Sequence, residues 1–214
     1  MRDILRTSLT LPLAILLGCG TGGLEQAELT GECAGELSCG TELDDGPLAV
    51  GASVELRASL TSPGTGSPAI ALIAADSSVI EARGDQILGV GSGMSAVLIT
   101  DDRGIVLDFF HVFVELPDHL QVTRVAGTAS GADLDGVLEL LVGDELTLTT
   151  RPSLGSQLLA GSAAATWTAG SEAVSVLRDG DPSRRRLVAR AVGDSTLTIE
   201  SMGLTRTINV NVLP

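Results

Sequence analysis

Three thiols, at Cys19, Cys33 and Cys39, are the side chains with the most distinctive chemistry in this 214-residue chain. A cysteine thiolate is alkylated readily, pairs into a disulfide, or binds a soft metal ion. Cys33 and Cys39 lie in a Gly-rich stretch that contains no histidine and no further cysteine. A structural disulfide is therefore the first interpretation of this pair, with a metal site or a redox dithiol as the alternative.

The residues before Cys19 have the layout of an export signal. Arg2 and Arg6 precede a mostly apolar run, Leu9–Leu17, which includes Thr10 and Pro12. A helix needs about 20 apolar residues to span a bilayer, so this run is too short to cross one. Its length is that of the apolar region of a signal peptide.

The segment Leu16–Cys19 resembles the lipobox of bacterial lipoproteins, with a small residue directly before the cysteine. The resemblance implies that residues 1–18 are a cleaved signal peptide and that the Cys19 thiol receives a diacylglyceryl group. At least two acyl chains would then anchor the protein stably to a membrane. Gly20 after the cysteine resembles the pattern of outer-membrane lipoproteins. The alternatives are an ordinary cleaved signal and a buried N-terminal helix.

Export would place Cys33 and Cys39 in an oxidising compartment, where a disulfide is expected. Closing so short a loop would stabilise the fold by about 2 kcal/mol in the chain-entropy model. Residues 19–45 are otherwise polar and Gly-rich. We therefore expect them to form a flexible tether between the lipid and the folded part.

Two acidic turns are candidate cation sites. Asp133 and Asp135 match half of a calcium-binding loop, but its twelfth position holds Asp144 instead of glutamate. Asp179 and Asp181 flank a glycine before a proline. We interpret both as surface turns and expect no bound metal.

Residues for catalysis are few. His111 and His119 are the two histidines, the first in an apolar strand and the second beside the expected linker. The sequence has no nucleophile elbow, no zinc-protease motif and no phosphate-binding loop. We expect a protein without enzymatic activity and without a cofactor, and the sequence assigns no ligand-binding residue.

Three further motifs each allow a functional and a structural interpretation. Trp167 would stack on a sugar if exposed, but its place in the strand pattern favours the core. The cluster Arg184–Arg186 would suit a phosphate or acidic glycan, or else a solvated strand end. Arg83–Asp85 has the letters of an integrin-binding tripeptide, and a turn between strands explains it equally well.

Composition limits both the core and the partners. Hydrophobic residues make up 44% of the chain but aromatic residues only 2%, so Val, Leu, Ile and Ala must form the core. The formal net charge of -14 opposes binding to nucleic acid. The acidic residues are spread along the chain, which is typical of a solvated surface.

Turn residues at short intervals separate runs in which apolar and polar residues alternate. In Thr207–Val212 the apolar residues share one side of the strand and Thr207, Asn209 and Asn211 share the other. This period of two predicts half-buried strands in antiparallel sheets. We therefore predict an all-β protein.

The chain also repeats itself. Val50–Leu56 matches Val142–Leu148, and Gly93–Ile99 matches Gly193–Ile199. A further match pairs Leu72 with Trp167. Each repeat has the size of an immunoglobulin-like sandwich.

The second repeat resembles the bacterial Ig-like domains of the group 2 type, through Val142–Leu148, Ala165–Ser171 and Leu187–Ile199. The first repeat matches less well because it has Leu72 in place of the Trp. The resemblance implies two tandem Ig-like sandwiches, at residues 46–116 and 117–214. By this resemblance we expect a lipid-anchored envelope protein with a structural or adhesive role, placed at the outer membrane. A glycan- or peptide-binding lipoprotein, or an accessory subunit of an envelope complex, is the alternative.

Overall fold

A computed structural model describes residues 26–32, 46–61, 69–126 and 129–214, and these residues form strands and no helix. The prediction of an all-β fold with two tandem Ig-like sandwiches is confirmed. Among the described residues there is accordingly no helix long and apolar enough to span a membrane. Cys19, Cys33 and Cys39 lie outside the described residues, so the expected lipid site and disulfide stay predictions.

The first sandwich packs two four-stranded sheets against each other. One sheet has the order β1 (Gln26–Glu32), β3 (Ser53–Thr61), β6 (Gln86–Gly89) and β5 (Ile80–Arg83). The other has the order β2 (Leu48–Ala49), β8 (Val106–Glu115), β7 (Gly93–Thr100) and β4 (Ala71–Ala74).

The second sandwich repeats this plan with two added short strands. Its larger sheet has the order β10 (Ala129–Asp133), β9 (His119–Ala126), β12 (Glu145–Leu154), β16 (Arg184–Ala189) and β15 (Val174–Arg178), with β13 (Gln157–Leu158) beside β12. Its smaller sheet has the order β11 (Val137–Leu141), β18 (Leu204–Leu213), β17 (Gly193–Ser201) and β14 (Thr166–Ala169).

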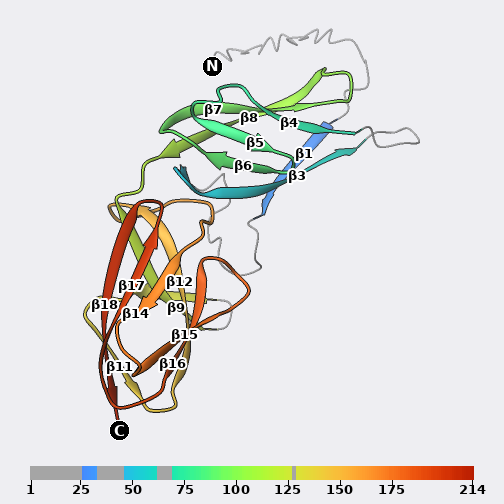
Figure 1. Ribbon diagram of the computed structural model, residues 1–214. Coiled ribbons are helices and arrows are strands. Elements are labelled where there is room, and N and C mark those ends of the chain that lie inside the picture. The colour runs from blue at the N-terminus through green and yellow to red at the C-terminus, as the bar shows by residue number, and fades with distance from the viewer. Residues whose placement is uncertain (1–25, 33–45, 62–68, 127–128) are drawn as a thin grey trace, which may run out of the picture.

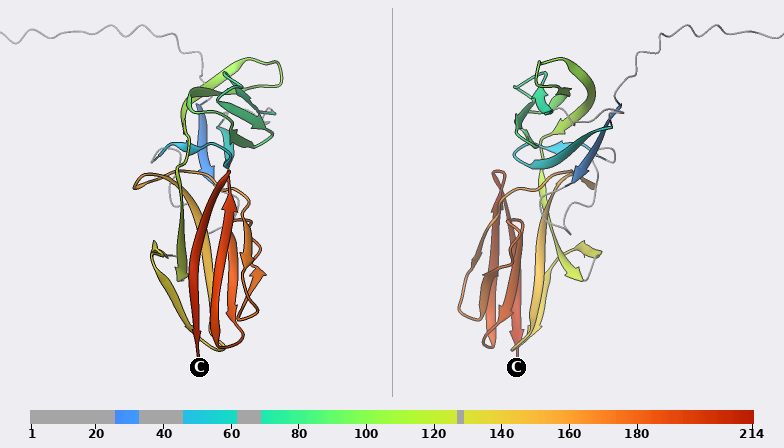
Figure 2. Two further views of the ribbon diagram at one scale, coloured as in Figure 1. Left: turned by 60° about the vertical axis from the view of Figure 1, so that its left-hand side comes forward. Right: turned by 90° about the vertical axis from the view of Figure 1, so that its right-hand side faces the viewer.

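The two sandwiches correspond strand by strand and lie end to end in an elongated molecule (Figures 1 and 2). In each, the last strand pairs in parallel with a short early strand, β2 with β8 and β11 with β18. Trp167 faces Ile199 across one sheet, and Leu72 faces Ile99 across the equivalent sheet. The equivalence of Leu72 and Trp167 that the sequence repeat predicts is therefore confirmed.

The predicted tether at residues 19–45 is wrong in its middle part. Residues 26–32 form β1, which pairs with β3 over seven residues. β1 is the counterpart of β9, because β9 pairs in the same antiparallel way with β12. The first sandwich therefore begins before residue 46, and the sequence signal was weak because Ala27 and Leu29 are the only apolar side chains in this alternating stretch.

Aliphatic side chains fill the space between the sheets, as the aromatic-poor composition requires. Strands of both sheets contribute alternate residues, so that Leu197, Ile199, Ile208 and Val210 are buried while their neighbours face outward. Trp167, 9% exposed, is the one large aromatic side chain in this core. Its Nε1 has no hydrogen-bond partner, which is a local cost that the apolar burial of the ring offsets.

The joint between the sandwiches is built from backbone pairing as well as from apolar contact. Ser53 and Ser162 exchange two N–H···O bonds of 2.9 Å. Leu159 comes from the second sandwich, yet it is 1% exposed and belongs to the core of the first. Gly161, at φ +94°, lies so close to Leu48 that an added Cβ would be 2.7 Å from Leu48 Cδ1. The joint thus requires glycine for both its conformation and its close packing.

We predict that Gly161→Ala destabilises the joint by roughly 1–3 kcal/mol, because it adds a strained φ and a steric overlap. Thermal unfolding followed by circular dichroism and by Trp167 fluorescence will measure this, since the single Trp reports on the second sandwich. The first sandwich should unfold at a lower temperature than the second in the variant. Gly155→Ala is the matched control, because Gly155 has φ +56° with nothing near its Cβ position. Equal effects of the two substitutions would contradict the packing argument.

Candidate functional site

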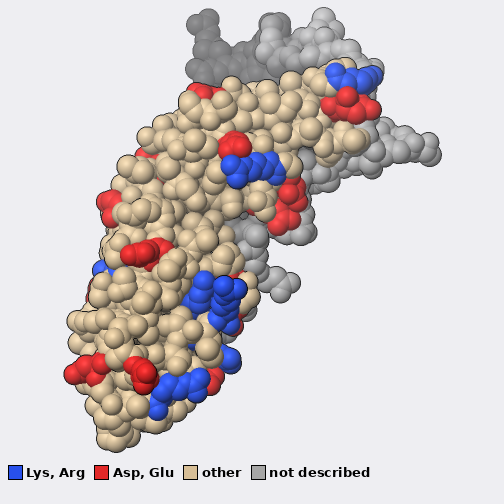
Figure 3. Space-filling model, in the orientation of Figure 1, with Lys and Arg blue, Asp and Glu red and all other residues tan. Residues whose placement is uncertain are grey.

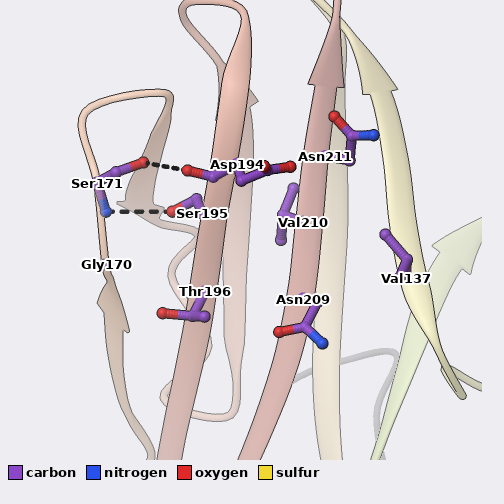
Figure 4. Close-up of a pocket in the computed structure, with 9 residues that line it drawn as sticks. All are labelled: Val137, Gly170, Ser171, Asp194, Ser195, Thr196, Asn209, Val210 and Asn211. Carbon is purple, nitrogen blue, oxygen red and sulfur yellow. Dashed lines mark hydrogen bonds between the residues drawn. The ribbon is translucent and has the colours of Figure 1, made fainter.

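A polar depression lies on the outward face of the sheet formed by β11, β18, β17 and β14 (Figure 4). Its volume is about 540 Å³. Strand register explains its composition, because Asp194 faces Asn211 and Thr196 faces Asn209 across β17 and β18. On β18, Asn209 and Asn211 alternate with the buried Val210 and Val212, so they point away from the core. Their partners on β17 point to the same outward face. The lining residues are Val137, Gly170, Ser171, Asp194, Ser195, Thr196, Asn209, Val210 and Asn211.

One wall of the depression is fixed by the loop after β14. The Ser171 N–H donates to Ser195 Oγ at 3.2 Å, and the Ser171 hydroxyl donates to the Asp194 carbonyl oxygen at 3.0 Å. The Gly170 N–H donates to the Thr196 carbonyl oxygen at 2.7 Å. A Cβ at Gly170 would collide with Thr196 Oγ1, so this position needs glycine for close approach of the loop to β17.

The floor of the depression presents both donors and acceptors to solvent. Figure 4 shows Asp194 beside Asn211 across β17 and β18, with Asn209 two residues before Asn211 on the same face of β18. Amide and carboxylate groups in such a row suit a ligand with several hydroxyl or amide groups. No histidine, cysteine or arginine is among its lining residues, and Asp194 is their one ionisable side chain.

The sequence singled out none of these lining residues as a site. It did place Asn209 and Asn211 on the solvent side of the last strand, and this orientation is confirmed. The alternation of residues could not show that the loop at Gly170 closes one side of the row, because that contact joins residues far apart in sequence.

The structure separates the two histidines. His111 lies on the outward face of β8, where its ring meets Phe109 edge-to-face with 5.5 Å between ring centroids. His119, on β9, has Nε2 at 3.4 Å from Asp133 Oδ2. They belong to different sandwiches, and neither lies in the depression.

The first candidate cation site is occupied by arginine. Arg206 Nη2 donates to Asp135 Oδ1 at 3.0 Å and lies 3.6 Å from Asp133 Oδ2. Asp133 Oδ1 also accepts the Val122 N–H at 2.7 Å. These carboxylates hold the turn between β10 and β11 against β9 and β18. Within the described residues, no group of three or more His, Cys, Asp and Glu side chains has a metal-binding arrangement.

The second acidic turn and the arginine cluster form one local unit between β15 and β16. Asp181 Oδ1 accepts both the N–H and the hydroxyl of Ser183 at 2.7 Å, which confirms the predicted turn. Arg185 donates to the carbonyl oxygens of Pro182 and Ala165, at 3.2 Å and 3.1 Å. Arg186 pairs with Glu145 at 3.4 Å.

The expectation of a solvated basic cluster is therefore wrong in part. The Arg184 side chain is only 11% exposed and lies 3.7 Å from Asp181. Sequence neighbours in a strand point to opposite faces, so the three arginines do not form one basic surface.

For the two remaining motifs, Trp167 and Arg83–Asp85, the structure agrees with the structural interpretation and not with the functional one. Trp167 is in the core and is not available for stacking on a sugar. Gly84, at φ +65°, and Asp85 form the turn between β5 and β6, as expected. Arg83, the last residue of β5, pairs with Glu81 at 2.7 Å. Figure 3 shows acidic and basic groups scattered over the face in view, with broad uncharged areas between them.

Comparison with known proteins identifies no family. No family model matches the chain, and no curated protein matches it. Among solved structures, domains 4 and 5 of the S-layer protein SbsC are similar at 16% identity, covering 72% of this chain and 82% of that one, with a TM-score of 0.30. The Escherichia coli adhesin FdeC matches at 14% identity over 89% of this chain and 64% of its own, with a TM-score of 0.35.

The third likeness is to invasin, a bacterial integrin-binding protein, at 16% identity over 87% of this chain and 40% of its own, with a TM-score of 0.31. TM-scores this low carry no argument about fold or function for this chain. The sheets and cores described above define its fold without them.

Two turns of the first sandwich hold a carboxylate with a lowered pKa, at Asp76 and at Asp101. The Ser78 hydroxyl and N–H lower the pKa of Asp76 by hydrogen bonding. The N–H of Ile105, followed by Arg103, lowers the pKa of Asp101, whose carboxylate accepts these bonds at 2.8 Å to 3.0 Å. These shifts follow from turn structure and indicate no catalytic group.

We predict that Asp101→Ala destabilises the first sandwich at neutral pH and that this difference from the wild type shrinks in acid. The folded-state pKa is lowered, so the stabilisation is present above the unfolded pKa of about 3.9. It is lost as pH falls through the folded pKa. Urea unfolding between roughly pH 3 and 7 will measure it, with the exposed neighbour in Asp102→Ala as control. A difference that stays constant down to pH 3 would be inconsistent with the turn hydrogen bonds as its source.

Proposed function

We propose that this chain is a lipid-anchored protein of the bacterial cell envelope whose two Ig-like sandwiches act as a non-catalytic structural or adhesive module. The lipobox-like segment Leu16–Cys19 supports the anchor, and Gly20 after it supports the outer membrane as the location. The group 2 Ig-like resemblance of the second sandwich supports an envelope role. Partners of such a module are another envelope protein or a glycan, and not nucleic acid.

The joint between the sandwiches is the observation that carries the structural role. Paired backbone bonds between Ser53 and Ser162, and between Ala160 and Pro47 at 2.8 Å, tie the two units together. The Ala49 N–H also donates to the Ala160 carbonyl oxygen at 3.1 Å. A joint fastened by several backbone bonds resists bending, so the units act as one stiff arm. An arm anchored near its N-terminus would present the second sandwich away from the membrane.

The anchor has a direct test in Cys19→Ala. We expect the variant to lose labelling by a radioactive or clickable fatty acid and to move from the membrane to the aqueous fraction, because the thiol is the acceptor of the lipid. Cys33→Ala, which leaves the lipobox intact, should remain acylated and membrane-bound. Membrane partition and acyl labelling that are unchanged in Cys19→Ala would refute the proposed anchor.

Glycan binding at the polar depression is a second candidate function. The row of Asp194, Asn209 and Asn211 favours it, because unpaired amide and carboxylate groups recognise sugar hydroxyls. The depression is large enough, at about 540 Å³, for one or two sugar rings.

We predict that the double variant Asn209→Ala/Asn211→Ala weakens binding to any glycan that the protein selects on an array by roughly tenfold. Each lost hydrogen bond contributes about 0.5–1.5 kcal/mol. Titration calorimetry will measure the affinity. The control is Thr207→Ala, on the same exposed side of β18 but outside the depression. Retention of full affinity in the double variant would exclude the depression as the glycan site.

A further inference from the structure

The outward face of the sheet β2-β8-β7-β4 in the first sandwich is apolar. Its side chains face outward because their neighbours along the strands, Val97, Ile99 and Val112, point into the core. Pairing between the strands arranges these outward side chains in three rows. One row is Ile73, Leu98 and Phe109; the next contains Ala96 and His111; the last contains Met94 and Phe113. We call these seven residues the apolar face.

Four of the seven side chains are strongly exposed to solvent. The exposed fractions are 45% for Ile73, 56% for Met94, 55% for Phe109 and 58% for Phe113. The whole chain has three phenylalanines, and two of them are exposed to solvent although the cores consist mainly of aliphatic side chains. Large apolar side chains gathered on one exposed sheet face mark an interaction surface.

The second sandwich supplies an internal comparison for this face. Its equivalent strands pair Thr168 with Thr198, and Thr198 with Thr207. These positions correspond to Ile73, Leu98 and Phe109 in the first sandwich. In the last row, Asp194 and Asn211 stand where the first sandwich has Met94 and Phe113. The fold therefore accepts polar residues at every one of these positions, and packing within the sandwich does not require the apolar ones.

We propose that the apolar face is the interface of a homodimer in which a second copy of the chain packs the same face against it. The seven positions carry no Asp, Glu, Lys or Arg, so two copies meet without burying a carboxylate against another carboxylate. The chain has a formal net charge of -14, so an interface without acidic side chains avoids adding local repulsion to the repulsion between two anionic copies. A two-fold axis through the face brings each row of one copy onto a row of the other.

The available area agrees with a dimer of moderate affinity. A fully covered aromatic or long aliphatic side chain buries about 200 Å², so four that are half exposed offer roughly 400 Å². The partly covered residues of the apolar face bring this to about 600 Å² per copy. Stable interfaces bury about 1,200 Å² or more in total, so two such faces reach the lower end of that range.

The test is photo-crosslinking of the full chain in a bacterial host, with Phe113→p-benzoylphenylalanine as the probe. We expect a product of twice the chain mass that contains only peptides of this chain. The same probe in Asn211→p-benzoylphenylalanine, at the equivalent position of the second sandwich, should give at least tenfold less product. A product containing a different protein, attachment to lipid alone, or no product of twice the mass would overturn the proposal.

A second arm tests the apolar character of the interface. The probe is moved to Met94, and Phe109→Thr/Phe113→Asn replaces two residues of the apolar face by those that the second sandwich carries. We expect the yield of crosslinked dimer to fall at least tenfold while the melting temperature stays within a few degrees, because both side chains are exposed. Thr207→Ala/Asn211→Ala is the matched control and should leave the yield unchanged. If the first double variant is destabilised, Phe113→Asn alone takes its place. An unchanged yield in a folded variant would also overturn the proposal.

Discussion

The register of the two long hairpins, β7 with β8 and β17 with β18, is the constraint on which the structure depends. Side chains alternate along each strand, so a slip of one residue would exchange every buried side chain for an exposed one. The present register buries Val112 and Val114 in one sandwich and Val210 and Val212 in the other. It thereby determines both cores, the polar depression and the apolar face in a single step. Glycines at the starts of β7 and β17 adopt positive φ, at 146° and 142°, and so begin both hairpins in the same way.

Much of the fold could be predicted from the sequence, because alternation and internal repetition are local or periodic signals. The pairing of Leu72 with Trp167 as equivalent positions followed from the repeat alone. The strand β1 was missed because its place in the sheet depends on pairing with β3, and Ala27 and Leu29 are its only apolar side chains. The ion pairs of Asp133 and Asp135 could not be predicted either, since their partner Arg206 is some seventy residues away in sequence.

The two interaction surfaces show why sequence reasoning finds a site less readily than a fold. The sequence identified His111 only as a histidine in an apolar strand. The structure makes it part of the apolar face, together with Phe109 and Met94 on the same side of the sheet. The polar depression similarly needs the loop at Ser171 to close a row of residues on β17 and β18. Both surfaces use equivalent strands of the repeat. One framework thus carries an apolar surface in the first sandwich and a polar one in the second, and each can change without altering a core.

Leu159 gives the joint a consequence for the order of folding. This residue of the second sandwich completes the core of the first, and Ser162 completes its backbone pairing at Ser53. Synthesis runs from the N-terminus, so the first sandwich emerges well before the residues that finish it. Its core can close fully only after the chain has been made beyond residue 162. The N-terminal half is therefore less stable during synthesis than in the finished protein.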